Sequence, residues 1–429
     1  MTAPQILQHP KTLRIRSYAS AVPSRIVEYT YYAVLFYTVV APGLGILVPY
    51  AASVTMLVLA AVCVIRLKSQ APTIWATAVY APMRLPFACV ISYLVVQITV
   101  YGEPVMVARS FINWMLMLII VQSLCLRREF LHRCALALFF IGLITLPYLI
   151  FKGSGMHERA IADEMVSGAV RGSNGLGTWF GYCCIYFTIV GLETKRIGIR
   201  VASWLTAVGC LYIVGLTVSR GALLATATGV TIAFRGPLKR GFLPLLAFIT
   251  LGGIIFNLGV FDRMISHYAT RGMEDTGRAA VWPLAIERFL NSPLLGVGGA
   301  NVATHVPGRA YPIIPHNTFI FFALSSGVLP LAFFVTWLIR AAQNAFSYSE
   351  RQTNSPFRLP FLVCTFWNVL FGDLGFMAPW DVVTLCIAMA PNMVYGVYHP
   401  AIRSVEASPT SQALDIPAEA SPLIAHRRL

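Results

Sequence analysis

The chain has 429 residues, of which 57% are hydrophobic and only 11% are charged. Soluble domains carry roughly 25% charged residues, so this composition excludes a water-soluble enzyme, a secreted disulfide scaffold and a disordered chain. The net charge of +15 is typical here of basic cytoplasmic loops facing anionic lipid rather than of nucleic-acid binding.

Long apolar runs predict an all-α, polytopic membrane protein with about twelve membrane-spanning helices of about 20 residues each. The first two spans form one long apolar stretch that Pro42, Gly43 and Pro49 interrupt. The expected spans are 29–47, 48–66, 85–102, 105–125, 131–151, 175–192, 201–217, 219–234, 242–260, 317–339, 358–377 and 380–398.

Lys and Arg orient these spans, because positive residues accumulate in cytoplasmic loops. With the N-terminus inside, every inside loop is basic, and an even number of spans places both termini in the cytoplasm. The chain then divides into a basic cytoplasmic N-terminus (1–28), a transmembrane catalytic domain (29–400) and a disordered cytoplasmic tail (401–429). Two long outer loops are expected, at 152–174 and at 261–316, the second directly before the tenth span.

The nine cysteines lie in or beside apolar runs and show no metal-ligand spacing, which predicts buried apolar side chains. The outer-loop histidines His267 and His305 match no zinc pattern. No GxxxxGK[ST] phosphate loop occurs, so ATP hydrolysis is not expected. We therefore predict neither a metal nor a cofactor.

Ten basic residues fall on the outer side or within the membrane, against the positive-inside bias. They are Arg109, Lys152, Arg159, Arg171, Arg220, Arg263, Arg271, Arg278, Arg288 and Arg309. Arginine binds phosphate in a bidentate way and stays charged, so a shared anionic ligand on the outer face would explain the set. For any single arginine, loop solubility and local pairing with acidic residues is an equal alternative.

Arg220 is the sharpest case, because it lies in a hinge of almost no length between two apolar spans. A charge at membrane depth is expensive and usually functional, and Gly221 allows close backbone approach. The alternative is an arginine that snorkels from an ordinary helix end. Arg109, early in the fourth span, either faces the same cavity or snorkels to the outer headgroups.

His316 closes the second outer loop at the mouth of the tenth span. An imidazole there can accept a proton near neutral pH, as a general base must. The alternative is an interfacial histidine at a helix end, with Asn317 as the capping residue.

Several motifs share the order found in one family of membrane enzymes. The first is Arg-x-x-x-Leu from Arg220 to Leu224, and the second is His-Asn, nine residues and Gly, from His316 to Gly327. Between them stand Gly277-Arg278, Trp282, Pro293 and Gly296-Val297-Gly298, and Arg171-Gly-Ser-Asn174 precedes them. Over about residues 165–340 the chain resembles the bacterial O-antigen ligase / O-antigen polymerase superfamily (Wzy and WaaL types).

The resemblance implies a glycosyltransferase in the bacterial inner membrane, with its active site facing the periplasm. Its donor would be a glycan on undecaprenyl pyrophosphate, and an acceptor sugar hydroxyl would attack the anomeric carbon with inversion. His316 would be the general base, and Arg220 and Arg278 would bind the pyrophosphate, since no Asp-x-Asp metal motif occurs. The other expected substrate-binding residues are Arg171, Asn174, Arg288, Trp282, Asn317 and Arg109.

Partners implied by this activity are the lipid-linked donor, the glycan acceptor and the bilayer, with a chain-length regulator and other polysaccharide-assembly proteins as candidates. We favour a polymerase of exopolysaccharide or O-antigen over an O-antigen ligase acting on the lipid A core. A glycan transporter and a non-catalytic assembly partner are more distant alternatives. Asp373 and Asp381, near the outer ends of late spans, either orient His316, contact the acceptor or solvate helix ends.

Overall fold

The computed structural model describes the greater part of the chain from α2 to α16. Described are residues 24–40, 51–70, 84–102, 130–153, 173–217, 219–238, 278–308, 312–346 and 355–371, with scattered residues in 116–124 and 250–269. Over these ranges the regular structure consists of eleven α-helices and one 3-10 helix. The prediction of an all-α protein is confirmed for this part of the chain.

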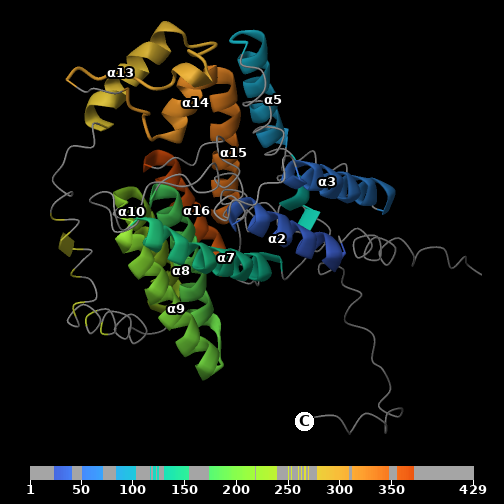
Figure 1. Cartoon of the computed structure of the whole chain (residues 1–429), viewed down its shortest axis with the longest axis vertical. Coiled ribbons are helices and arrows are strands. Elements are labelled where there is room, and N and C mark those ends of the chain that lie inside the picture. Colours follow the sequence, from blue (N-terminus) through green and yellow to red (C-terminus); the bar gives the residue numbers. More distant parts are fainter. Residues whose placement is uncertain are drawn as a thin grey trace, which may run out of the picture.

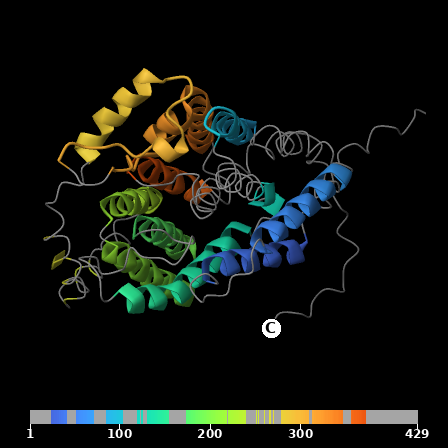
Figure 2. The same ribbon diagram turned by 45° about the horizontal axis from the view of Figure 1, so that its top comes forward.

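Figure 1 shows the helices in chain order. They are α2 (Arg25–Val40), α3 (Ala51–Gln70), α5 (Arg84–Thr99), α7 (Phe130–Gly153), α8 (Ser173–Glu193), α9 (Ile197–Leu216), α10 (Arg220–Leu238), α13 (Arg278–Asn291), η2 (Gly299–Asn301), α14 (Thr318–Ser326), α15 (Val328–Phe346) and α16 (Ser355–Phe371). The helices α5, α14 and α15 form one group and α8, α9 and α10 a second, with α16 packed between them (Figure 2).

Most described helices coincide with predicted spans, but the region before α16 differs. The expected span 317–339 is two helices, α14 and α15, because Gly327 between them has a φ of 81° that ends the first helix. The expected outer loop 261–316 contains the helix α13 and the 3-10 helix η2. The spans 105–125, 242–260 and 380–398 lie wholly or largely outside the described residues, so the number of twelve spans stays a prediction.

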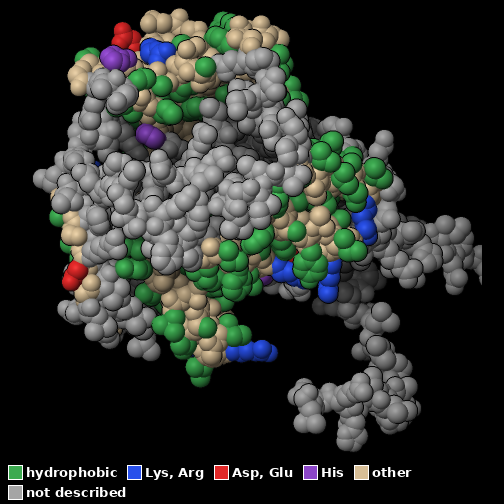
Figure 3. Space-filling model, viewed as in Figure 1, with side chains coloured by type: hydrophobic (Ala, Val, Ile, Leu, Met, Phe, Trp, Pro, Cys, Tyr) green, Lys and Arg blue, Asp and Glu red, His purple; other side chains and the backbone are tan. Residues whose placement is uncertain are grey.

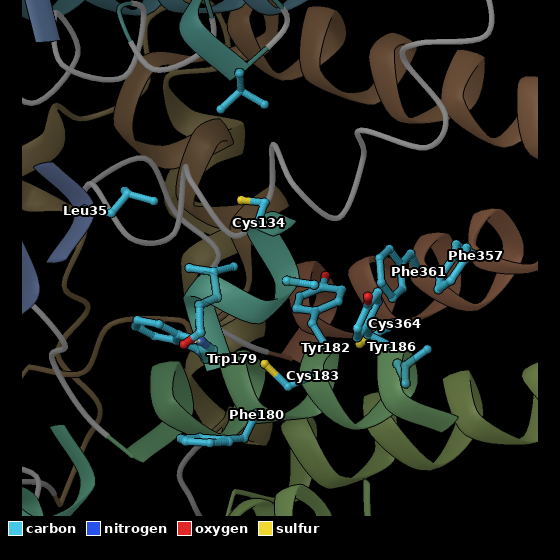
Figure 4. Packing of buried hydrophobic residues seen from close by; sticks show 14 of the residues in the cluster. Leu35, Cys134, Trp179, Phe180, Tyr182, Cys183, Tyr186, Phe357, Phe361 and Cys364 are labelled. Atoms are coloured by element: carbon cyan, nitrogen blue, oxygen red, sulfur yellow. Dashed lines mark hydrogen bonds between the residues drawn. The ribbon is translucent and has the colours of Figure 1, made fainter. Parts of the chain in front are cut away.

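Helix α8 forms the centre of the second group because small residues let neighbouring helices approach it closely. A Cβ added at Gly177 would lie 2.9 Å from the Cβ of Ala222 on α10, and one at Gly181 would meet Thr226 on the same helix. Gly177 and Gly181 form the Gly-x-x-x-Gly pattern that favours close helix pairs in membranes. On its other side, α8 contributes Trp179 and Tyr182 to the apolar core that Figure 4 shows.

Polar bonds fix the register of α16 against α8. Thr178 Oγ1 donates to Asn368 Oδ1 at 2.9 Å, and the hydroxyls of Tyr182 and Thr365 lie 2.7 Å apart. Both pairs are buried, where an unsatisfied polar group would cost about 1–3 kcal/mol. This register also sets the position of Phe371, which follows Asn368 on α16 by about one helical turn.

The outward surfaces of several helices are apolar. Along α9 the side chains of Ile197, Val201 and Leu205 are 74%, 51% and 58% exposed, and their four-residue spacing puts them on one face. Apolar side chains cover much of the described surface over α2, α3 and α9 (Figure 3). Exposed apolar side chains in such numbers are unfavourable in water and suit lipid.

By helix length and composition, fewer segments qualify as membrane spans than the apolar surface suggests. Among the described residues two segments are long and apolar enough to cross a bilayer, Gly175–Glu193 and Ile197–Leu216. Two such segments are by themselves weak support for a membrane protein. The first is mostly buried by other helices and the second mostly is not, which fits a central and a peripheral helix.

The helix ends gather into two sets. In one set, α2, α7 and α8 meet through an ion pair from Arg133 to Glu28 at 3.3 Å and a contact of 3.0 Å between His132 Nδ1 and the Tyr186 hydroxyl. The other set joins the start of α8, the α9–α10 hinge and the end of α16. The predicted topology places the first set in the cytoplasm and the second outside. Within each set, the predicted topology assigns all the helix ends to the same side of the membrane.

The cysteines match their prediction where they are described. Cys63, Cys89, Cys134, Cys183, Cys184, Cys210 and Cys364 are free thiols and buried. The expectation for Cys125 and Cys386 falls outside the described residues.

Candidate active site

Arg220 is the first residue of α10, directly after the hinge from α9. Ser219 caps the helix, since its hydroxyl accepts from the Ala222 amide at 3.4 Å. The Arg220 side chain is exposed. A cation at the positive end of a helix dipole is unfavourable by itself, whereas an anion there is attracted by both the dipole and the guanidinium. The first turn of α10 is therefore suited to a phosphate group.

His316 has an unusual backbone. Its φ of 44° is the one positive value among the non-glycine residues that the structure describes, and such conformations are uncommon and cluster at functional sites. Its side chain is half-buried. The next residue, Asn317, is the N-cap of α14, and its Oδ1 accepts from the Ile320 amide at 3.1 Å. The capping role considered for Asn317 is confirmed.

The spacing of the His-Asn-x9-Gly motif is the length of one helix. The nine residues of α14 lie between Asn317 as N-cap and Gly327 as C-cap. A Cβ at Gly327 would collide with the carbonyl oxygen of Leu294, and the next amide, of Val328, donates to Pro293 O at 2.9 Å. The motif therefore fixes both ends of α14 and the chain that passes beside it.

Trp282 on α13 connects the histidine segment to the arginine segment. Its indole Nε1 donates to the carbonyl of Pro315, directly before His316, at 2.6 Å. Its ring stacks on Phe371, with centroids 6.0 Å apart and planes 20° apart. Phe371 in turn lies on Gly221, where an added Cβ would be 3.0 Å from the Phe371 carbonyl oxygen. The two motifs, almost a hundred residues apart, thus share one structural unit.

The remaining arginines of the motif region have different surroundings. Arg278 begins α13, one turn before Trp282, and the structure describes its backbone only. Arg288 Nη1 donates to Ala303 O at 3.0 Å and to Thr304 Oγ1 at 3.1 Å, and its Nη2 donates to Asn301 O at 2.9 Å. These bonds tie α13 to the segment after η2. We expect Arg288 to organise this loop rather than to bind pyrophosphate.

Asn174 lies at the same end of the bundle as Arg220. It is in the first turn of α8, three residues before Gly177, and an added Cβ at Gly177 would be 2.8 Å from Thr217 Oγ1 in the α9–α10 hinge. Arg109, Arg171, Asp373 and Asp381 lie outside the described residues. Their suggested roles stay predictions.

Two residues of α5 and its end support the site and were not singled out from the sequence. Gln97 is buried; its Nε2 donates to Ser325 O at 2.6 Å and its Oε1 accepts from the Gly299 amide at 2.8 Å. The Tyr101 hydroxyl donates to Gly296 O at 2.8 Å, and Gly298 packs against the Tyr101 ring. The signal for Gln97 was a single amide in an apolar run, which is costly in a membrane unless it is hydrogen-bonded.

Replacing Gln97 by leucine should destabilise the loop that leads to His316. The variant leaves the Ser325 carbonyl and the Gly299 amide without their side-chain partner, and each buried unsatisfied group costs about 1–3 kcal/mol. We expect a lower unfolding temperature of the purified protein in detergent. Thr99→Val on the same helix is the control, because the Thr99 hydroxyl donates to the Val95 carbonyl of its own helix. An equal loss in both variants would contradict this role.

Among the described residues, no group of three or more His, Cys, Asp or Glu side chains could hold a metal ion. Near the α9–α10 hinge, the described part of the chain presents to an anionic ligand the exposed Arg220 at the N-terminus of α10. The arrangement can therefore do two things: hold a phosphate at Arg220 and place an imidazole at His316 on the same scaffold.

The described helices, with apolar outer faces and an exposed arginine at a helix N-terminus, are compatible with a membrane-embedded enzyme that acts on an anionic substrate. Residues 205–335 match the family model described as O-Antigen ligase. The matched segment contains Arg220, Trp282, His316 and Gly327, so the predicted resemblance is confirmed over this range. The protein is accordingly a glycosyltransferase-type enzyme of polysaccharide biosynthesis that uses lipid-linked donors. Among curated proteins, none matches the chain.

Proposed function

We propose that the protein polymerises undecaprenyl-pyrophosphate-linked oligosaccharide units into exopolysaccharide or O-antigen at the periplasmic face of the bacterial inner membrane. The proposal includes both termini in the cytoplasm, a catalytic domain over 29–400 and outer loops at 152–174 and 261–316. The donor, the growing glycan and the bilayer are its partners, with a chain-length regulator as a further candidate.

In the proposed step an acceptor hydroxyl oxygen attacks the anomeric carbon of the donor. The bond from that carbon to the phosphate oxygen breaks, and its electron pair leaves with undecaprenyl pyrophosphate. His316 takes the hydroxyl proton, a role that typically contributes about 10²- to 10⁴-fold. Arg220 and Arg278 stabilise the charge that develops on the leaving group, with Asn174 at the same end of the bundle as a candidate substrate contact.

One observation carries this assignment. The Arg220–Gly221 segment and the Pro315–His316 segment are joined by the contacts of Trp282 and Phe371, within and beside the segment that matches the O-antigen ligase family. A cation for the leaving group and a base for the acceptor are the two groups that an inverting transfer without a metal needs.

A ligase that transfers the finished glycan to the lipid A core is the second candidate, and the description of the matched family favours it. Both enzymes use the same donor and the same leaving group. The transporter and the non-catalytic partner are not proposed further, because the matched family is enzymatic.

Complementation of a strain lacking this gene separates the candidates. His316→Ala should abolish the product, while His305→Ala, an exposed histidine of the same region, should retain it, with membrane levels of both checked by blot. Single repeat units accumulating on the lipid carrier in the His316→Ala strain would support the polymerase. Long glycan stranded on the carrier would support the ligase. Unchanged surface glycan would overturn the role of His316.

A further inference from the structure

Trp282 is one of the predicted substrate contacts, and its polar group and one ring face are engaged by protein groups in the structure. The indole N–H is used in the bond to Pro315 O at 2.6 Å, and one ring face is covered by Phe371. Its ring is only partly exposed. A residue whose one donor and one face are committed to the scaffold is better placed to hold neighbouring residues than to bind a sugar.

The backbone at His316 has a conformation that neighbouring groups must stabilise. His316 has a φ of 44°, a conformation disfavoured for residues with a Cβ and kept only where the surroundings determine it. On the C-terminal side, the Asn317 cap fixes the chain to α14. On the N-terminal side, the described contact that fixes the Pro315 carbonyl is the bond from Trp282. The peptide between Pro315 and His316 is thus held from α13.

The stack on Phe371 gives this bond a fixed direction. Phe371 is itself stacked on Trp367, with centroids 5.5 Å apart and planes 12° apart, and both belong to α16. That helix is registered on α8 by the bond between Thr178 and Asn368. The orientation of the Trp282 ring therefore derives from α16 and α8, the two helices that pack against the hinge and the start of α10.

We propose that Trp282 is a positioning residue, which sets the direction of the His316 imidazole relative to Arg220 through its bond to Pro315 and its stack on Phe371. This inference rests on the proposed function, in which His316 is the base. Small displacements of a catalytic group lower turnover strongly, by about 10²-fold for 1 Å, whereas binding of the donor depends on the arginines.

The test uses the full-length protein in lipid nanodiscs with lipid-linked glycan extracted from a strain lacking the gene. Trp282→Phe keeps an aromatic ring for the stack and removes the N–H donor. We expect kcat to fall about 10- to 100-fold while KM for the donor stays unchanged. A benzothiophene analogue of tryptophan at the same position, which keeps the fused rings without the N–H, should give the same loss and guards against poor folding of the phenylalanine variant.

Trp179→Phe is the matched control. Trp179 is buried on α8 and its Nε1 donates to the Leu138 carbonyl at 3.1 Å, so this variant also loses an indole–carbonyl bond, but away from His316. It should retain kcat. An unchanged kcat in Trp282→Phe, an equal loss in Trp179→Phe, or a raised KM at constant kcat would each overturn the inference.

His316→Ala in the same assay distinguishes a failure of the base assignment from a failure of the positioning role. If that variant retains kcat, the base assignment fails and the positioning role fails with it. If His316→Ala loses kcat and Trp282→Phe does not, only the positioning role is wrong.

Discussion

Replacing Arg220 by alanine is expected to lower turnover by about 10²- to 10³-fold, the usual effect of removing one preorganised donor from a site where negative charge develops. The guanidinium is exposed at the first turn of α10, so its removal should leave folding intact. Arg220→Lys should recover part of the rate, because lysine keeps the charge but cannot bind phosphate in a bidentate way. Turnover of lipid-linked glycan by purified protein measures the effect.

Arg235→Ala is the control for that prediction. Arg235 is also exposed and lies in the last turn of the same helix, where a cation interacts favourably with the dipole. It should keep full turnover. Equal rates in the Arg220→Ala and Arg235→Ala variants would remove Arg220 from the site.

Replacing Gly327 by alanine is expected to destabilise the protein by about 2–6 kcal/mol, from backbone strain together with overpacking. Its φ of 81° and ψ of −168° fall in a region that is essentially restricted to glycine. The added Cβ would also collide with the Leu294 carbonyl. The unfolding temperature in detergent and the level of protein in the membrane should both fall.

Gly308→Ala measures the effect of backbone strain at positive φ without the steric collision of the added Cβ. Gly308 has the same φ of 81°, but an added Cβ there would meet nothing within 4 Å. This variant should lose only the strain part of the effect. If Gly308→Ala and Gly327→Ala are equally stable, the packing of Leu294 against the end of α14 does not explain why the motif ends in glycine.

The other motif glycines also serve packing around the C-terminal end of α14. The turn from Ser292 to Gly298 passes the C-terminal end of α14, and a Cβ at Gly296 would collide with the Leu324 carbonyl. Gly298 makes room for the Tyr101 ring at the end of α5. The Gly-x-Gly pair and Gly327 are therefore packing requirements, whereas Arg220 and His316 are candidates for the reaction itself.

The sequence by itself determined the helical class, the place of most helices and the site motifs, because apolar runs, misplaced arginines and glycine spacing are local features of the chain. For the same reason it predicted the hinge before Arg220 and offered the cap at Asn317 as the alternative to a substrate contact. It did not predict the break of the span 317–339 at Gly327 or the helix α13 within the outer loop, since both depend on what packs beside them.

Only the tertiary structure decided which residues fix the loop and the helices around His316. Gln97, Tyr101 and Phe371 come from α5, the turn after it and α16, and no spacing in the sequence links them to His316. The sequence also could not predict the hydrogen bonds of Arg288 and Trp282 to backbone carbonyls. Every residue has such a carbonyl, so the residue type does not show which one will accept a bond. Contacts of side chains with distant backbone form only when the helices assemble, which is why we propose scaffold roles for these two residues only from the folded structure.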